Sequence, residues 1–159
     1  MFPYFKISLV SIAIFIFLGN TKGQTLSNSE RIKIEKQVDS VFQSAIKYAE
    51  NLEYDKLSAG VDDKQNAGFI ANGAYYQKYD SLVAVVKSKS VGISGHQITL
   101  QHKKVTVLSH DIVLITAIGN SKVEVANGTV FNVKFFWTFV YERVNHQWKV
   151  IQSHQSTVR

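Results

Sequence analysis

The side chains best suited to chemistry in this sequence stand near the end of the chain, between Gln152 and Ser156. His154 carries an imidazole, which can move a proton near neutral pH or anchor a ligand through a hydrogen bond. Gln152 and Ser156 each stand two residues from it and can both donate and accept hydrogen bonds. Because side chains alternate across a strand, we expect all three on one face. The pattern predicts a ligand anchor, with His154 as a general base in the catalytic alternative and as a structural histidine in the simplest one.

An aromatic face is predicted beside His154. Residues 129–144 and 147–159 have the composition of two strands, and Asn145-His146 between them suits a two-residue turn because Asn tolerates a positive φ. If Val144 pairs with Gln147, counting back sets Phe139 opposite Gln152, Trp137 opposite His154 and Phe135 opposite Ser156. An aromatic face with a few polar groups is typical of a small-molecule pocket. The predicted ligand-binding aromatics are Phe135, Trp137, Phe139 and Tyr141.

Three further residues complete the predicted site. Asp55 is the remaining carboxylate candidate for a catalytic role, although capping the short helix that begins there is a simpler function. Tyr54 precedes it and is expected at the pocket rim. His102 joins the aromatic face only if a one-residue bulge at Lys103-Lys104 changes the alternation of its strand.

Neither a cofactor nor a metal is predicted. The sequence shows no dinucleotide fingerprint, phosphate loop or Ser-His-Asp arrangement. It has no cysteine, which excludes disulfides and thiolate catalysis. His96, His102 and His154 have neither carboxylate partners nor helical spacing, and a closed zinc site needs about four ligands.

The composition is that of one ordinary globular domain. The 159 residues are 45% hydrophobic and 19% charged, with a formal net charge of +6. Lys6 and Lys22 fall in a predicted leader, so the remaining chain has 16 basic and 12 acidic residues, a net charge of +4. These charges are scattered rather than gathered in a stripe, which argues against a nucleic-acid partner.

Residues 1–23 read as a secretory signal peptide. Lys6 precedes an apolar run, Ile7 to Leu18, and small residues at Thr21 and Gly23 suit cleavage before Gln24. The mature domain, residues 24–159, is therefore expected to be secreted or periplasmic and free of the membrane. An uncleaved N-terminal anchor is the alternative.

The order of predicted elements is helices first and strands last. A capping box at Ser27 and Glu30 begins a helix with an apolar stripe that continues to Ala49. A short helix at 54–59, a hairpin at Asn72-Gly73 and a helix at 80–88 follow. Four long strands are expected at 96–108, 112–125, 129–144 and 147–159. This order predicts an α+β domain in which a curved antiparallel sheet wraps around about three helices to form a cone.

The chain resembles the nuclear transport factor 2-like superfamily, in its SnoaL-like branch. The residues that carry the resemblance are the FFWTFVYER strand, the ending Trp148-Lys149-Val150-Ile151 with His154 and Ser156, the segment Leu52 to Leu57, and the run from Phe69 through Asn72-Gly73 to Leu82. The resemblance implies the cone-shaped (cystatin-like) fold, a pocket between sheet and helices, and frequent dimerisation through the sheet. It implies no single activity, because such folds include isomerases, hydrolases and non-catalytic binding domains.

The outer face of the sheet is expected to be a homodimer interface, since it is too apolar to stand bare in water. Its expected members are Phe136, Val140, Ile151, Val113, Ile115 and Ala117. The function predicted for the domain is non-catalytic binding of a small, partly apolar molecule. One alternative is an isomerase, dehydratase or hydrolase with His154 as general base. The other is a protein-interaction module whose cone is filled by Trp137, Tyr75 and Tyr76.

Overall fold

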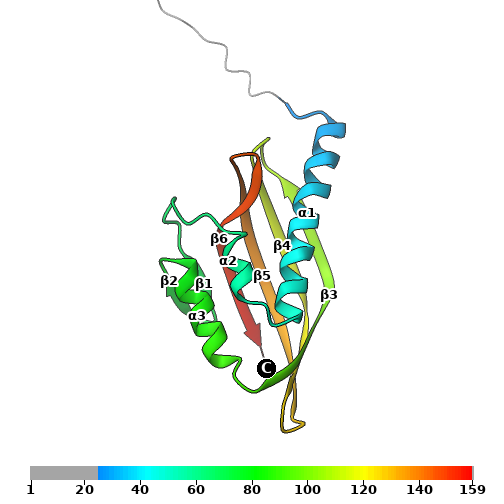
Figure 1. The fold of residues 1–159 in the computed structure, drawn as a ribbon. Coiled ribbons are helices and arrows are strands. Elements are labelled where there is room, and N and C mark those ends of the chain that lie inside the picture. Colours follow the sequence, from blue (N-terminus) through cyan, green and yellow to red (C-terminus); the bar gives the residue numbers. More distant parts are fainter. Residues whose placement is uncertain (1–24, 159) are drawn as a thin grey trace, which may run out of the picture.

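The computed structural model of the protein describes residues 25–158 and confirms the α+β fold (Figure 1). The predicted leader, residues 1–23, lies outside the described residues. In chain order the elements are α1 (Asn28–Glu50), α2 (Asp55–Ser58), β1 (Phe69–Ala71), β2 (Ala74–Tyr76), α3 (Tyr79–Lys89), β3 (Ile93–Val107), β4 (Ile112–Val125), β5 (Val130–Val144) and β6 (Gln147–Val158). None of the helices within residues 25–158 combines the length and apolar composition that crossing a lipid bilayer requires.

Helix α1 begins and packs as its sequence pattern predicts. The Ser27 hydroxyl accepts a hydrogen bond from the Glu30 amide, and the Glu30 carboxylate accepts one from the Ser27 amide. Its buried side chains follow a spacing of four residues and form one stripe against the sheet. They are Ile34, Val38, Phe42 and Ile46. Burial of each contributes about 1.5–3 kcal/mol, which fixes the helix over the concave side.

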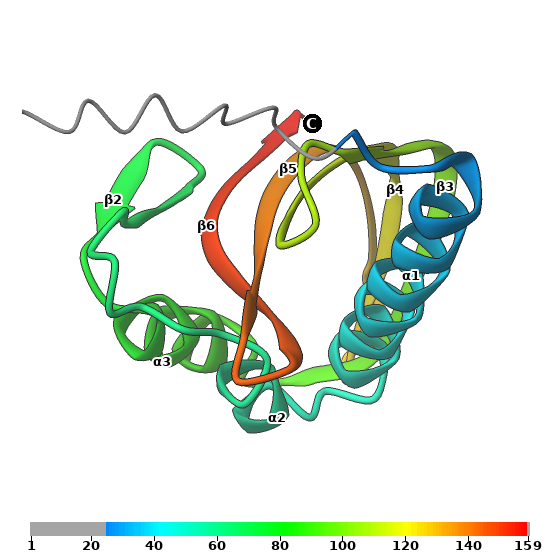
Figure 2. The same ribbon diagram turned by 90° about the horizontal axis from the view of Figure 1, so that it is seen from above.

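The six strands form one curved sheet in the order β2-β1-β6-β5-β4-β3. All neighbours are antiparallel except β1 and β6, which are parallel. Seen from above, α1 runs beside β3, α3 lies on the side of β1 and β2, and α2 lies between the two helices (Figure 2). The three helices therefore all lie on the concave side of the sheet.

The β5–β6 turn is as predicted, but the register beyond it is not. Asn145 and His146 both have positive φ, and the pairs run from Val144 with Gln147 to Tyr141 with Val150. A bulge at Ile151 then shifts the register by one residue, so that Trp137 pairs with Gln155. At this point β6 passes from its contact with the loop at Val61 to its pairing with β1. The prediction that places Gln152, His154 and Ser156 on the aromatic face is therefore wrong.

A second bulge lies in β3, at Gln101 rather than at Lys103-Lys104. Lys103 consequently points inward, where its ammonium group binds the Asp39 carboxylate of α1. His102 pairs with Ile118 and lies exposed on the outer face, so its predicted place on the aromatic face is also wrong.

The two faces of β4 are the reverse of those predicted. Val113 pairs with Tyr141 and Ile115 pairs with Phe139, which brings these residues and Ala117 to the concave side. All three are at most 1% exposed and belong to the core, not to the outer face. The reason is the pairing itself, because cross-strand partners share a face.

Candidate functional site

A cavity of about 980 Å³ lies between the concave face of the sheet and the three helices. Its sheet side is aromatic: Trp137, Phe139, Tyr141 and Trp148 line it. Its helix side is supplied by Phe42, Ile46, Tyr54, Leu57, Tyr79 and Leu82. Both its size and its lining are typical of a site for a small organic molecule.

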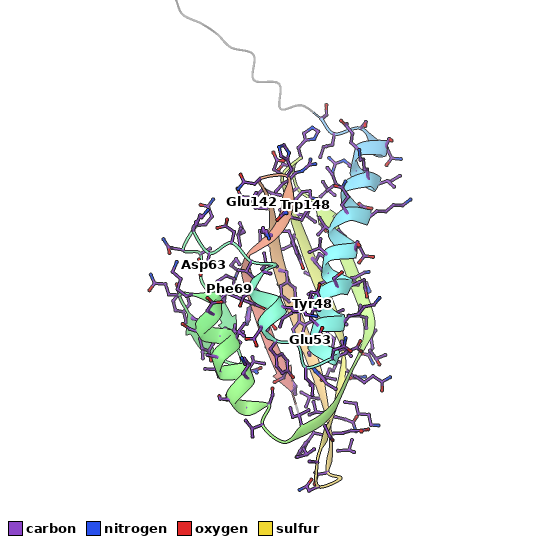
Figure 3. All side chains as sticks on the ribbon, viewed as in Figure 1. Tyr48, Glu53, Asp63, Phe69, Glu142 and Trp148 are labelled. Atoms are coloured by element: carbon purple, nitrogen blue, oxygen red, sulfur yellow. The ribbon has the colours of Figure 1, made fainter. Side chains whose placement is uncertain are left out.

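The aromatic rings of the cavity are fixed by one another. Trp137 is stacked on Phe135 with ring centroids 3.8 Å apart, and Phe42 meets Phe139 edge-on at 5.7 Å. At the other end, the indole N–H of Trp148 donates to the side-chain oxygen of Gln37 at 3.2 Å. Figure 3 shows Trp148 beside α1, where β5 turns into β6. The lining is therefore held in place before any ligand arrives.

Four of the predicted ligand-binding residues line this cavity: Tyr54, Trp137, Phe139 and Tyr141. Phe135 shares their face but is fully buried under Trp137 and does not line the cavity. Its ring lies over Gly119, where an added Cβ would stand 2.5 Å from it. Phe135 supports the cavity floor from below.

The predicted polar anchors lie elsewhere. His154 pairs with Thr138 on the convex face and is exposed, and Gln152 and Ser156 share that face. None of the three lines the cavity. The bulge brings Gln155 into the cavity in their place, with its amide 3.2 Å from the Ser153 hydroxyl.

Asp55 also lies outside the cavity. Its side chain is 80% exposed and its carboxylate oxygens lie 2.8 and 2.9 Å from the ammonium group of Lys87 on α3. It makes no capping hydrogen bond to α2. The residue joins two helices at the surface and faces no cavity group that it could serve as a catalytic partner.

His96 is a cavity residue that is absent from the predicted site. Its Nδ1 lies 3.1 Å from the Ala49 carbonyl oxygen, which can only accept, so Nδ1 carries the proton. Its Nε2, 2.7 Å from the Ser121 hydroxyl, then accepts from that group. Burial lowers the pKa of His96, against smaller opposing effects of the Ala49 hydrogen bond and the Glu50 charge. The sequence did contain a sign of this position. His96, Ile98 and Leu100 follow one another at intervals of two residues, so they lie on the same inward face of β3.

Three tyrosines of the cavity lining have hydroxyls without a hydrogen-bond partner among the described residues. Tyr54, Tyr79 and Tyr141 all line it and are 8%, 8% and 1% exposed. These hydroxyls take part in no hydrogen bond among the described residues. Every fully enclosed side-chain nitrogen or oxygen in this part of the chain has a hydrogen-bond partner. Their oxygens are therefore not fully enclosed by protein. Burial raises the pKa of Tyr79 to about 12 and that of Tyr141 further, so both remain protonated donors.

Charge in the lining is of one sign. The charged side chains that line the cavity are Lys36, Lys56, Arg143 and Lys149. No Asp or Glu of the described chain is among the lining residues. Within residues 25–158, no three His, Asp or Glu side chains come close enough to hold a metal ion.

A curved sheet closed by helices around such a cavity is the architecture of the nuclear transport factor 2-like fold. The model of the SnoaL-like domain matches residues 38–159, and the chain belongs to this family. No curated protein matches the chain significantly.

Solved structures show the same fold at low identity. A candidate dehydratase of the nuclear transport factor 2-like family from Streptomyces avermitilis is 18% identical, with a TM-score of 0.67 over 81% of this chain and 99% of its own. A candidate scytalone dehydratase from Novosphingobium aromaticivorans is 9% identical, with a TM-score of 0.69 over 84% and 89%. A hexachlorocyclohexane dehydrochlorinase, LinA type 2, is 12% identical, with a TM-score of 0.69 over 84% and 90%.

Proposed function

We propose that the protein binds a small, partly apolar molecule in the cavity without converting it. The observation that carries this proposal is the pairing of an aromatic, preformed cavity with the absence of any lining carboxylate among the described residues. The aromatic walls supply burial energy, and the hydroxyls of Tyr54, Tyr79 and Tyr141 supply donors for a ligand oxygen or nitrogen.

The catalytic alternative has less support. Proton transfer needs a base within reach of the substrate. His154 lies on the opposite face, and His96 has both ring nitrogens engaged by Ala49 and Ser121. His146 lines the cavity only from the exposed β5–β6 turn. The dehydratase and dehydrochlorinase names of the structural neighbours therefore give no reaction to this chain.

The filled-cone alternative has less support as well. It requires Trp137, Tyr75 and Tyr76 to plug the interior. Tyr75 is 63% exposed, Tyr76 does not line the cavity, and Trp137 lies in its wall. The remaining cavity of about 980 Å³ has the size of a small-molecule site, which supports ligand binding over a filled cone.

A titration calorimetry experiment with N-phenyl-1-naphthylamine, an uncharged aromatic probe, tests the proposal. We expect one probe per chain. Ala45→Phe places a ring in the cavity from α1 and should abolish binding. Ala84→Phe makes the same change on the exposed side of α3, outside the cavity, and should leave binding intact. Equal binding to both variants contradicts the proposal.

We also propose that the chain is exported through residues 1–23 and forms a homodimer through the outer sheet face. The dimer is supported by the half-exposed apolar side chains there: Leu114, Ile118, Phe136 and Val140. Light scattering should show a dimer for the wild type and a monomer for Phe136→Lys.

The export proposal is tested by N-terminal sequencing of the protein purified from its host. The sequence should begin at Gln24, whereas an intact leader would favour the membrane anchor.

A further inference from the structure

The cavity has a cationic end and an apolar end. Of the four charged side chains in its lining, two already have partners. The Lys56 ammonium lies 2.7 Å from a Glu53 carboxylate oxygen, and the Lys149 ammonium donates to the Ala59 carbonyl at 2.5 Å. Arg143 and Lys36 have no carboxylate within 4 Å in the described part of the chain. These two cations are therefore available to a ligand.

Arg143 and Lys36 belong to the same end of the cavity. The Arg143 guanidinium lies 5.9 Å from the centre of the Trp148 ring, its cross-strand partner. That ring is tied to α1 by its hydrogen bond to Gln37, the neighbour of Lys36. Both cations are exposed at the β5–β6 end, where Figure 3 shows Trp148 beside α1. Water at this rim spares a bound anion the full cost of desolvation.

The opposite end offers a ligand no unpaired charge among the described residues. Away from the β5–β6 turn the lining includes His96, Gln155 and Lys56, which is paired with Glu53. Most of the other side chains there are aromatic or aliphatic: Phe42, Ile46, Leu82, Val86, Ile98, Trp137 and Phe139. A ligand that satisfies both ends must be amphipathic. Its apolar body fits among these side chains, and its anionic group faces the guanidinium, whose planar donor fork matches carboxylate, sulfonate or phosphate oxygens.

We infer that the ligand is an amphipathic organic anion, with its charged group held between Arg143 and Lys36 and its apolar body between α1 and the aromatic strand β5. This inference rests on the proposed function, because it names the chemical class of molecule that the same cavity takes. It also gives the ligand a fixed direction in the cavity: the anionic group is the last part of the ligand to enter and the first to leave.

Two probes that differ in one charged group test it. Anilinonaphthalene-8-sulfonate has the body of N-phenyl-1-naphthylamine with a sulfonate added. One good charge-assisted contact corresponds to roughly a tenfold change in affinity, so we expect the sulfonate probe to bind about ten times more tightly. In the double variant Arg143→Gln/Lys36→Gln, the affinity for the sulfonate probe should fall about tenfold more than the affinity for the neutral probe, so that the advantage of the sulfonate is lost. The control Lys47→Gln/Lys104→Gln removes two exposed lysines outside the cavity and should change neither affinity.

The outcomes separate the two proposals. If the neutral probe binds once per chain and is blocked by Ala45→Phe, but the sulfonate gives no advantage, the cavity binds ligands and the anion inference is overturned. The anion inference is likewise overturned if the advantage survives Arg143→Gln/Lys36→Gln or disappears equally in the lysine control. If neither probe binds in the cavity, the proposed function itself fails, and the anion inference fails with it.

Discussion

His154 lies opposite Thr138 on the convex face of the sheet, one residue out of register with Trp137. The bulge at Ile151 produces this offset and separates the most reactive side chain of the final strand from the cavity. The surface that we propose for homodimer formation is on the same convex face as His154.

We predict that His154→Ala leaves the affinity for N-phenyl-1-naphthylamine within about twofold of wild type, since its side chain touches no cavity group. Trp137→Ala should weaken the same binding by at least about tenfold, because it removes an indole ring that lines the cavity and uncovers Phe135. Titration calorimetry of both variants checks this. Loss of binding in His154→Ala with an unchanged fold would place the site on the other face.

Tyr141→Phe should change the free energy of unfolding by less than about 0.5 kcal/mol. The hydroxyl has no protein partner among the described residues, so its removal leaves no buried donor or acceptor unsatisfied. Tyr141→Ala removes the whole ring from a position that is 1% exposed and should cost about 3–5 kcal/mol. Urea denaturation measures both. A loss above about 1.5 kcal/mol in Tyr141→Phe would reveal a hydrogen bond that the structure lacks.

Gly119→Ala should destabilise the sheet by about 1–3 kcal/mol, because a Cβ there would stand 2.2 Å from the Thr99 carbonyl oxygen and 2.5 Å from the Phe135 ring. Gly95→Ala is the matched control. Its Cβ would meet only the flexible Glu124 side chain, at 3.2 Å, and the cost should be small. Thermal unfolding of the two variants tests the difference, and equal melting temperatures would contradict the close packing of β3, β4 and β5.

The pH dependence of stability should contain a contribution from His96. Burial lowers its pKa in the folded state below the ordinary value of 6.5, so between the two values the unfolded chain binds more protons. The neutral imidazole therefore contributes fully above pH 6.5, and this contribution is lost as the pH falls toward the folded-state pKa. Urea midpoints at about pH 7.5, 6.5 and 5.5 should fall less steeply for His96→Gln than for wild type. Parallel slopes would show that His96 titrates normally.

The sequence predicts those parts of the fold in which apolar and polar residues follow a clear periodic pattern. Helix α1 repeats apolar residues every three or four positions, and the Asn145-His146 turn fixes the first pairs of β5 and β6. Residues 152–157 of β6 are all polar, so no hydrophobic pattern marks the bulge that reverses their faces. Residues 112–118 of β4 present the opposite problem, because apolar side chains stand on both faces.

The cavity depends on contacts that local pattern does not contain. The parallel pairing of β1 with β6 joins residues more than 80 positions apart, and it begins two residues after the bulge at Ile151. His96 is bound by Ala49 and Ser121 from two other elements. Such groups become visible as site residues only once the topology brings their elements together, whereas the aromatic wall of β5 follows from alternation within a single strand.

The central claim, a ligand cavity inside the cone, can be tested by fluorescence. The chain has two tryptophans, and both Trp137 and Trp148 line the cavity. N-phenyl-1-naphthylamine bound there should quench their emission by energy transfer, with saturation at one equivalent and no saturable quenching in Ala45→Phe. Quenching that rises linearly with probe concentration, or that saturates equally in Ala45→Phe, would contradict a ligand cavity at this position.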